Sequence, residues 1–95
     1  MADKTIELYE IVTINAQYLP VHGQEGYIVD RAMNNKGILY YAVKLYSDDN
    51  AWALGGFELS PSGQVDQSKK DSGDCGIKVV IDEVTGLGCI VKEEG

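Results

Sequence analysis

The sequence predicts an all-β domain, a small SH3-like barrel of about five to six antiparallel strands. Segments rich in β-branched and aromatic residues alternate with turns that contain Gly, Pro, Asn or Asp, and no segment keeps a helical period. The chain has 95 residues, which is the usual size of one domain. A sheet in so short a chain removes its exposed edges most simply by curling on itself. We therefore expect a single β-barrel domain over residues 1–95.

The first two predicted strands span residues 5–14 and 26–32. Residues 5–14 are rich in β-branched and aromatic side chains, but neither alternate set of positions is apolar throughout. A bend or bulge near Tyr9 and Glu10 is therefore expected. The Asn-rich segment 33–37 ends in glycine, which is typical of a hairpin turn because Asn and Gly tolerate positive φ.

The clearest strand spans residues 38–46, because its apolar residues alternate. One face carries Leu39, Tyr41, Val43 and Leu45, and the other carries Tyr40, Ala42, Lys44 and Tyr46. The first face is the better candidate for the core. After the polar turn 47–50, residues 51–57 resume as a strand, in which Gly55 and Gly56 predict a bulge or sharp bend.

The remaining segments predict a turn, a loop and two further strands. Residues 58–63 read as a short turn, or as one turn of 3₁₀ helix of the kind that links the last strands of small barrels. Residues 64–76 are polar and have few apolar anchors, so we expect a mobile surface loop. Residues 76–82 and 89–92 are apolar enough to form strands.

The charge of the chain argues against nucleic-acid binding. Fifteen acidic residues against eight basic ones give a formal net charge of −7, and this field repels a polyanion. The same field attracts and steers a basic partner, although negative charge also simply keeps a protein in solution. The sequence MADKTIELYE has no apolar core of a signal peptide, and no apolar run is long enough to cross a bilayer. We expect a cytoplasmic protein that does not bind a membrane.

No residue pattern predicts catalysis, a cofactor or a metal site. The one histidine, His22, lies in a loop rich in Pro and Gly, where exposure to water is a simpler expectation than a catalytic triad. Cys75 and Cys89 are too few for a disulfide framework and match no metal-binding spacing, so both are expected to be free thiols. We therefore expect no enzyme activity, no cofactor and no bound metal.

Two features of residues 40–63 allow both a structural and a functional interpretation. Asp48 and Asp49 suit a turn because aspartate hydrogen-bonds its own backbone, but two adjacent negative charges also favour an external cationic group. Trp52 shares a face with Leu54 and so suits the core. At the mouth of a barrel, beside tyrosines, it would instead form part of an interface or of a cation-binding surface.

The run GQEGYIVDRAMNNKGILYYAVKLYSDDNAWALGGFELSPSG has a characteristic order of parts. A Gly-x-x-Gly entry, an apolar strand, a turn, a Tyr-x-Val strand, an acidic turn, a Trp strand and a Leu…Gly ending follow one another. Over roughly residues 5–63 the chain thereby resembles a small immunity-protein family of bacterial polymorphic toxin systems, the one numbered thirty-one, for which an SH3-like fold is expected. Just before Leu59, where that family is expected to be more acidic, only Glu58 carries a charge.

The resemblance implies a protein that binds a cognate toxin and neutralises it, with no chemistry of its own. An acidic immunity protein can fill the basic active-site cleft of such a toxin through steered association. The residues expected to meet the partner are Tyr46, Asp48, Asp49, Trp52, Phe57 and Glu58, with the carboxylates supplying charge and the aromatics supplying anchors.

Two other classes of binding protein remain open. One is an SH3-like or Tudor-like recognition module that holds a peptide or a methylated side chain in an aromatic cage. Such a cage would need exposed aromatics, and it fails if Tyr27, Tyr41 and Trp52 are buried in the core. The other is an accessory subunit that positions a housekeeping enzyme.

Overall fold

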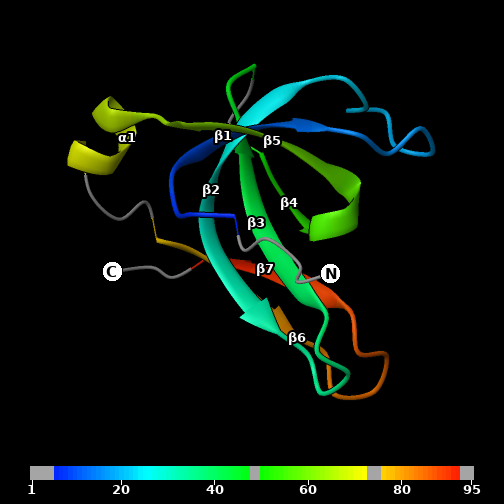
Figure 1. Cartoon of the computed structure of the whole chain (residues 1–95). Coiled ribbons are helices and arrows are strands. Elements are labelled where there is room, and N and C mark those ends of the chain that lie inside the picture. The colour runs from blue at the N-terminus through cyan, green and yellow to red at the C-terminus, as the bar shows by residue number, and fades with distance from the viewer. Residues whose placement is uncertain (1–5, 48–49, 73–75, 93–95) are drawn as a thin grey trace.

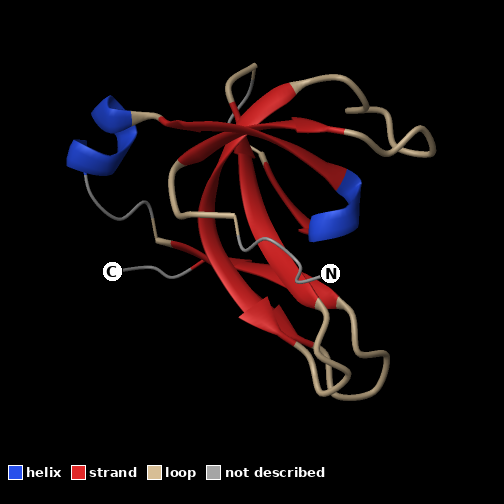
Figure 2. Cartoon of the chain, in the orientation of Figure 1, coloured by secondary structure: helices blue, strands red, loops and turns tan. Residues whose placement is uncertain are grey.

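The structure, a computed structural model, describes residues 6–47, 50–72 and 76–92 (Figure 1). The described elements are β1 (Glu10–Ile14), β2 (Glu25–Met33), β3 (Leu39–Leu45), β4 (Ala51–Gly55), η1 (Gly56–Glu58), β5 (Leu59–Val65), α1 (Gln67–Ser72), β6 (Ile77–Ile81) and β7 (Gly88–Lys92). Strands dominate and the two helical segments are short (Figure 2). The prediction of a small all-β fold is confirmed.

The first five strands form one antiparallel sheet in the order β4-β3-β2-β1-β5, and β6 pairs with β7 in a separate hairpin. Two register shifts bend the large sheet, one in β2 between Ile28 and Asp30 and one between β1 and β5 beyond Glu10. Tyr9 has a φ of 67° and lies in a turn just before β1. The predicted bend near Tyr9 and Glu10 is therefore confirmed, although β1 begins at Glu10 rather than at residue 5.

One face of the sheet holds the larger core cluster. Alternate residues of β1 and β3 point into it, because period-two alternation places them on one face. Tyr41 is the largest fully buried side chain, and its hydroxyl accepts a hydrogen bond of 3.0 Å from the Ile6 amide. The buried members are Ile6, Val12, Ile14, Ala16, Val21, Ile28, Tyr41, Val43, Leu45, Leu54 and Leu59. The expected core face of the third strand is thus confirmed.

The opposite face of β3 is also buried, which the sequence did not lead us to expect. Tyr40 and Ala42 lie on that face and form a second core cluster with Ile77 and Val79 of β6. Gly88 of β7 sits directly on Tyr40, since a Cβ built on this glycine would lie 2.7 Å from the Tyr40 Cβ. The β6–β7 hairpin therefore forms a second layer over the sheet (Figure 1).

The tips of two hairpins are joined. The side-chain nitrogen of Asn34 donates a 2.8 Å hydrogen bond to the Gly86 carbonyl. The side-chain oxygen of Asn34 accepts hydrogen bonds from the backbone amides of Lys36 and Ile38. Asn34 therefore shapes its own turn and ties it to the turn between β6 and β7, which lies beside it in Figure 1.

The region after β4 differs most from the sequence prediction. Residues 59–63, expected as a turn, belong to strand β5, whose edge position tolerates Pro61. The expected mobile loop 64–76 contains the end of β5 and the helix α1. The 3₁₀ turn does exist, but it spans Gly56–Glu58 and so accounts for the predicted bend at Gly55 and Gly56. In the described part of the chain, no helix is long and apolar enough to span a membrane.

Candidate partner-binding site

The described residues of the predicted site are Trp52, which lies within β4, and two groups beyond the two ends of this strand. Tyr46 follows β3, whereas Phe57 and Glu58 belong to η1, beyond the other end of β4. A five-residue strand separates the two groups by about 13 Å. Asp48 and Asp49 lie outside the described residues. The geometry therefore does not merge the predicted residues into one patch.

Glu58 is buried, and its carboxylate points into the protein. One carboxylate oxygen accepts a 3.1 Å hydrogen bond from the Gly55 amide, and the other accepts a hydrogen bond from the Tyr18 hydroxyl. The Glu58 carbonyl accepts a further bond of 2.8 Å from the Asn15 amide. Glu58 thus holds the β1–β2 loop against η1, and its position gives it a structural role rather than that of an exposed charge.

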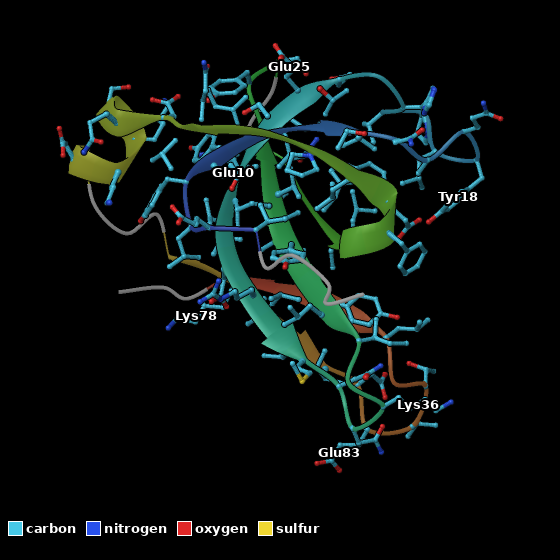
Figure 3. All side chains as sticks on the ribbon, viewed as in Figure 1. Glu10, Tyr18, Glu25, Lys36, Lys78 and Glu83 are labelled. Carbon is cyan, nitrogen blue, oxygen red and sulfur yellow. The ribbon has the colours of Figure 1, made fainter. Side chains whose placement is uncertain are left out.

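Two exposed aromatic side chains flank Glu58. Phe57 is 74% exposed and Tyr18 is 72% exposed, which makes them the most exposed aromatics among the described residues. Figure 3 shows Tyr18 at the outer end of the β1–β2 loop, beside η1. The Phe57 ring lies over Gly55, where an added Cβ would meet it at 2.4 Å. The sequence does not predict Tyr18 as a site residue, because no local pattern indicates that its loop folds back onto η1.

Trp52 and the tyrosines proposed for an aromatic cage do not form an open cage. Trp52 is partly buried and packs against the larger core cluster, as its structural interpretation predicted. Tyr41 is fully buried in that cluster, and Tyr27 is 5% exposed on the other side of the sheet. The prediction of an aromatic cage formed by these three residues is therefore wrong.

Tyr46 belongs to a different group, which we call the tyrosine row and which consists of Tyr9, Tyr27 and Tyr46. The rings of Tyr9 and Tyr27 stack with centroids 6.5 Å apart, and those of Tyr27 and Tyr46 are tilted at 5.3 Å. The register explains the row: Tyr27 pairs with Ile11 and Lys44, and the other two tyrosines lie two residues from these partners.

Helix α1 lies against the tyrosine row and is attached to it through Asp66. One Asp66 carboxylate oxygen accepts hydrogen bonds from the Ser68 hydroxyl at 2.8 Å and the Lys69 amide at 3.3 Å, so it caps the helix. The other oxygen accepts a 2.5 Å hydrogen bond from the Tyr46 hydroxyl. The Lys69 ammonium lies 5.7 Å from the centre of the Tyr27 ring.

The contact between Tyr46 and Asp66 changes the pKa of both groups. Burial, together with the hydrogen bond to Asp66, raises the pKa of the Tyr46 hydroxyl far above its ordinary value of 10.0. The hydrogen bonds donated by Tyr46 and then by Ser68 lower the pKa of the Asp66 carboxyl below its ordinary value of 3.8. The pair is therefore most stable as a neutral phenol and an ionised carboxylate.

Removing the Tyr46 hydroxyl should produce a pH-dependent loss of stability. Because folding raises the pKa of Tyr46, its contribution is complete below about pH 10 and is lost as the pH rises further. Because folding lowers the pKa of Asp66, its contribution is lost as the pH falls below about 4. We expect Tyr46→Phe to lower the free energy of unfolding by a constant amount between about pH 5 and 9 and by less outside that range. Urea unfolding of the wild type and of Tyr46→Phe at several pH values measures the difference in the free energy of unfolding. A difference that does not vary with pH would contradict the prediction.

The residues that the structure describes form no metal site. Among them, no group of three His, Cys, Asp or Glu side chains is arranged to hold a metal ion. Every buried side-chain nitrogen and oxygen in the described ranges has a hydrogen-bond partner. The Cys89 thiol is free and exposed, whereas Cys75 lies outside the described residues.

Comparison of the chain with protein-family models, with curated proteins and with solved structures found no match. Evidence on function therefore comes from the residues of this chain and their positions.

Proposed function

We propose that this chain is an immunity protein that binds a cognate bacterial toxin and neutralises it, with Phe57 and Tyr18 as the anchors of the interface. The observation that supports this most directly is the exposure of two large aromatic rings near the buried Glu58: Phe57 precedes it in the chain, and the Tyr18 hydroxyl donates a hydrogen bond to its carboxylate. Aromatic side chains of this kind supply much of the binding energy at protein interfaces.

The anchors are held in place before any partner binds. The Tyr18 hydroxyl is fixed by Glu58, and the Phe57 ring rests on Gly55. Side chains that are already ordered lose less conformational entropy on binding, which favours affinity. Glu58 is then a positioning residue, and Tyr46 and Trp52 support the fold near the surface rather than meet the partner.

The charge of the chain suits a basic partner. The formal net charge of −7 would speed its encounter with a toxin whose active-site cleft is basic. On this proposal, association slows as salt is added, while the contacts of Phe57 and Tyr18 set the rate of dissociation.

The first test is retention of a partner by the tagged chain from its native cells, with identification by mass spectrometry. The proposal requires one stoichiometric partner with a toxin domain, and co-expression of the chain must restore growth of bacteria that produce this toxin. Retention of a housekeeping enzyme instead would favour an accessory subunit and would overturn the proposal.

Phe57→Ala should weaken binding of that toxin by about thirtyfold or more, since truncation of an interface anchor costs about 2 kcal/mol or more. The matched control is Val84→Ala, because Val84 is 92% exposed in the turn between β6 and β7, away from η1. Titration calorimetry with each purified variant measures the two dissociation constants. Equal affinity of the two variants would show that Phe57 is not an anchor.

A further inference from the structure

The tyrosine row has the composition of a binding site for an organic cation. Aromatic faces attract cations through the ring quadrupole, and the attraction increases when carboxylates lie nearby. Two acidic residues lie beside the row. The Asp66 carboxylate accepts a hydrogen bond from the Tyr46 hydroxyl, and the Glu25 carbonyl accepts one of 3.3 Å from the Tyr46 amide. Glu25 is the first residue of β2 and lies at the upper edge of the molecule in Figure 3.

This chain already places a cation of its own on the row. Lys69 holds its ammonium 5.7 Å from the centre of the Tyr27 ring. Tyr27 is nevertheless 5% exposed, so the residues above it, Lys69 among them, cover it closely. Lys69 itself is exposed, as are its neighbours on α1 whose side chains are described.

The attachment of the Lys69 side chain is weak. Helix α1 has six residues, and none of its described side chains belongs to either core cluster. A helix this short has little stability of its own, so its position depends on the Asp66 cap and on the contact of Lys69 with Tyr27. Displacing only the Lys69 side chain leaves the cap intact.

We propose that Tyr9, Tyr27 and Tyr46, with Glu25 and Asp66, form a binding site for an ammonium or guanidinium group, and that Lys69 occupies this site within the chain. An incoming cation competes with the Lys69 side chain for the face of Tyr27. The site lies beyond the end of β4 opposite to Phe57, and it does not depend on the identity of the toxin.

The test is binding of tetramethylammonium to the full chain, followed through the tyrosine ring signals in NMR spectra. This ion has no N–H group, so it reports on the aromatic faces rather than on hydrogen bonds to carboxylates. We expect Lys69→Ala to bind it about three- to tenfold more tightly than Lys70→Ala does. Lys70 is the matched control because it is the next residue of α1, is exposed, and changes the net charge by the same amount.

Two further measurements distinguish a site that Lys69 occupies from a general effect of net charge on the binding of tetramethylammonium. Lys69→Met keeps the side-chain stem over Tyr27 without its charge, so it should bind as weakly as Lys70→Ala. The neutral analogue tert-butanol should not shift the tyrosine signals of Lys69→Ala. Equal affinity in the three variants, or saturable binding of tert-butanol by Lys69→Ala, overturns the proposal. Retained dispersion of the other amide signals shows that each variant is folded.

Discussion

Tyr41→Ala should lower the free energy of unfolding by about 3–5 kcal/mol, the usual cost of removing a large aromatic side chain from a packed core. Tyr41 is the largest fully buried side chain, and a Cβ added to Gly56 at the start of η1 would lie 3.2 Å from its ring. A domain of this size is stable by about 5–15 kcal/mol, so the substitution removes a large share of that stability. Urea unfolding followed by the fluorescence of Trp52 measures the change.

Tyr41→Phe separates the ring from the hydroxyl. The Tyr41 hydroxyl accepts a 3.0 Å hydrogen bond from the Ile6 amide. Removal of the hydroxyl leaves this buried N–H without that partner. We expect a loss of about 1–2 kcal/mol for Tyr41→Phe, well below that for Tyr41→Ala. If Tyr41→Ala were no less stable than Tyr41→Phe, the ring would not be part of the main core.

Val79→Asp should detach the β6–β7 hairpin, at a cost of more than about 3 kcal/mol, because it would bury a charge among apolar side chains. Val79 is 4% exposed and packs with Tyr40 and Ala42. Its amide donates a 3.0 Å hydrogen bond to Asp30, so a new carboxylate would also lie near an existing one. Urea unfolding and hydrogen exchange at the amides of β3 measure the loss.

Val80→Asp is the matched control. Val80 is the next residue of the same strand, but it points outward and is 46% exposed. The same change of chemistry there should cost less than about 1 kcal/mol. Similar losses for the two variants would mean that the hairpin is not held by an apolar layer.

Much of the fold follows from local patterns. The alternation in residues 38–46 correctly identified the core face of β3, because neighbouring side chains of a strand point to opposite sides. Gly55 and Gly56 correctly predicted a bend, although the strand expected over residues 51–57 ends at Gly55, where η1 follows. The turn chemistry of residues 33–37 also matched the structure, since Asn34 and Gly37 make the turn there.

The candidate site was less predictable, because burial is a property of the whole fold. Phe57, which the sequence predicted to meet a partner, is exposed, but the neighbouring Glu58 points inward to the Gly55 amide and Tyr18. Tyr18 is 40 residues away from Glu58 along the chain, and no local pattern records such a contact.

By itself the sequence determined an acidic, all-β chain and the inward face of its central strand, because composition and period-two alternation are local properties. The tertiary structure decided that Tyr40 and Ala42 are buried as well, since only the return of the β6–β7 hairpin covers them. It also decided that α1 places Lys69 on Tyr27. Both results depend on contacts between residues far apart in the chain. Such contacts can stabilise the protein only once the sheet has formed and has brought these residues together.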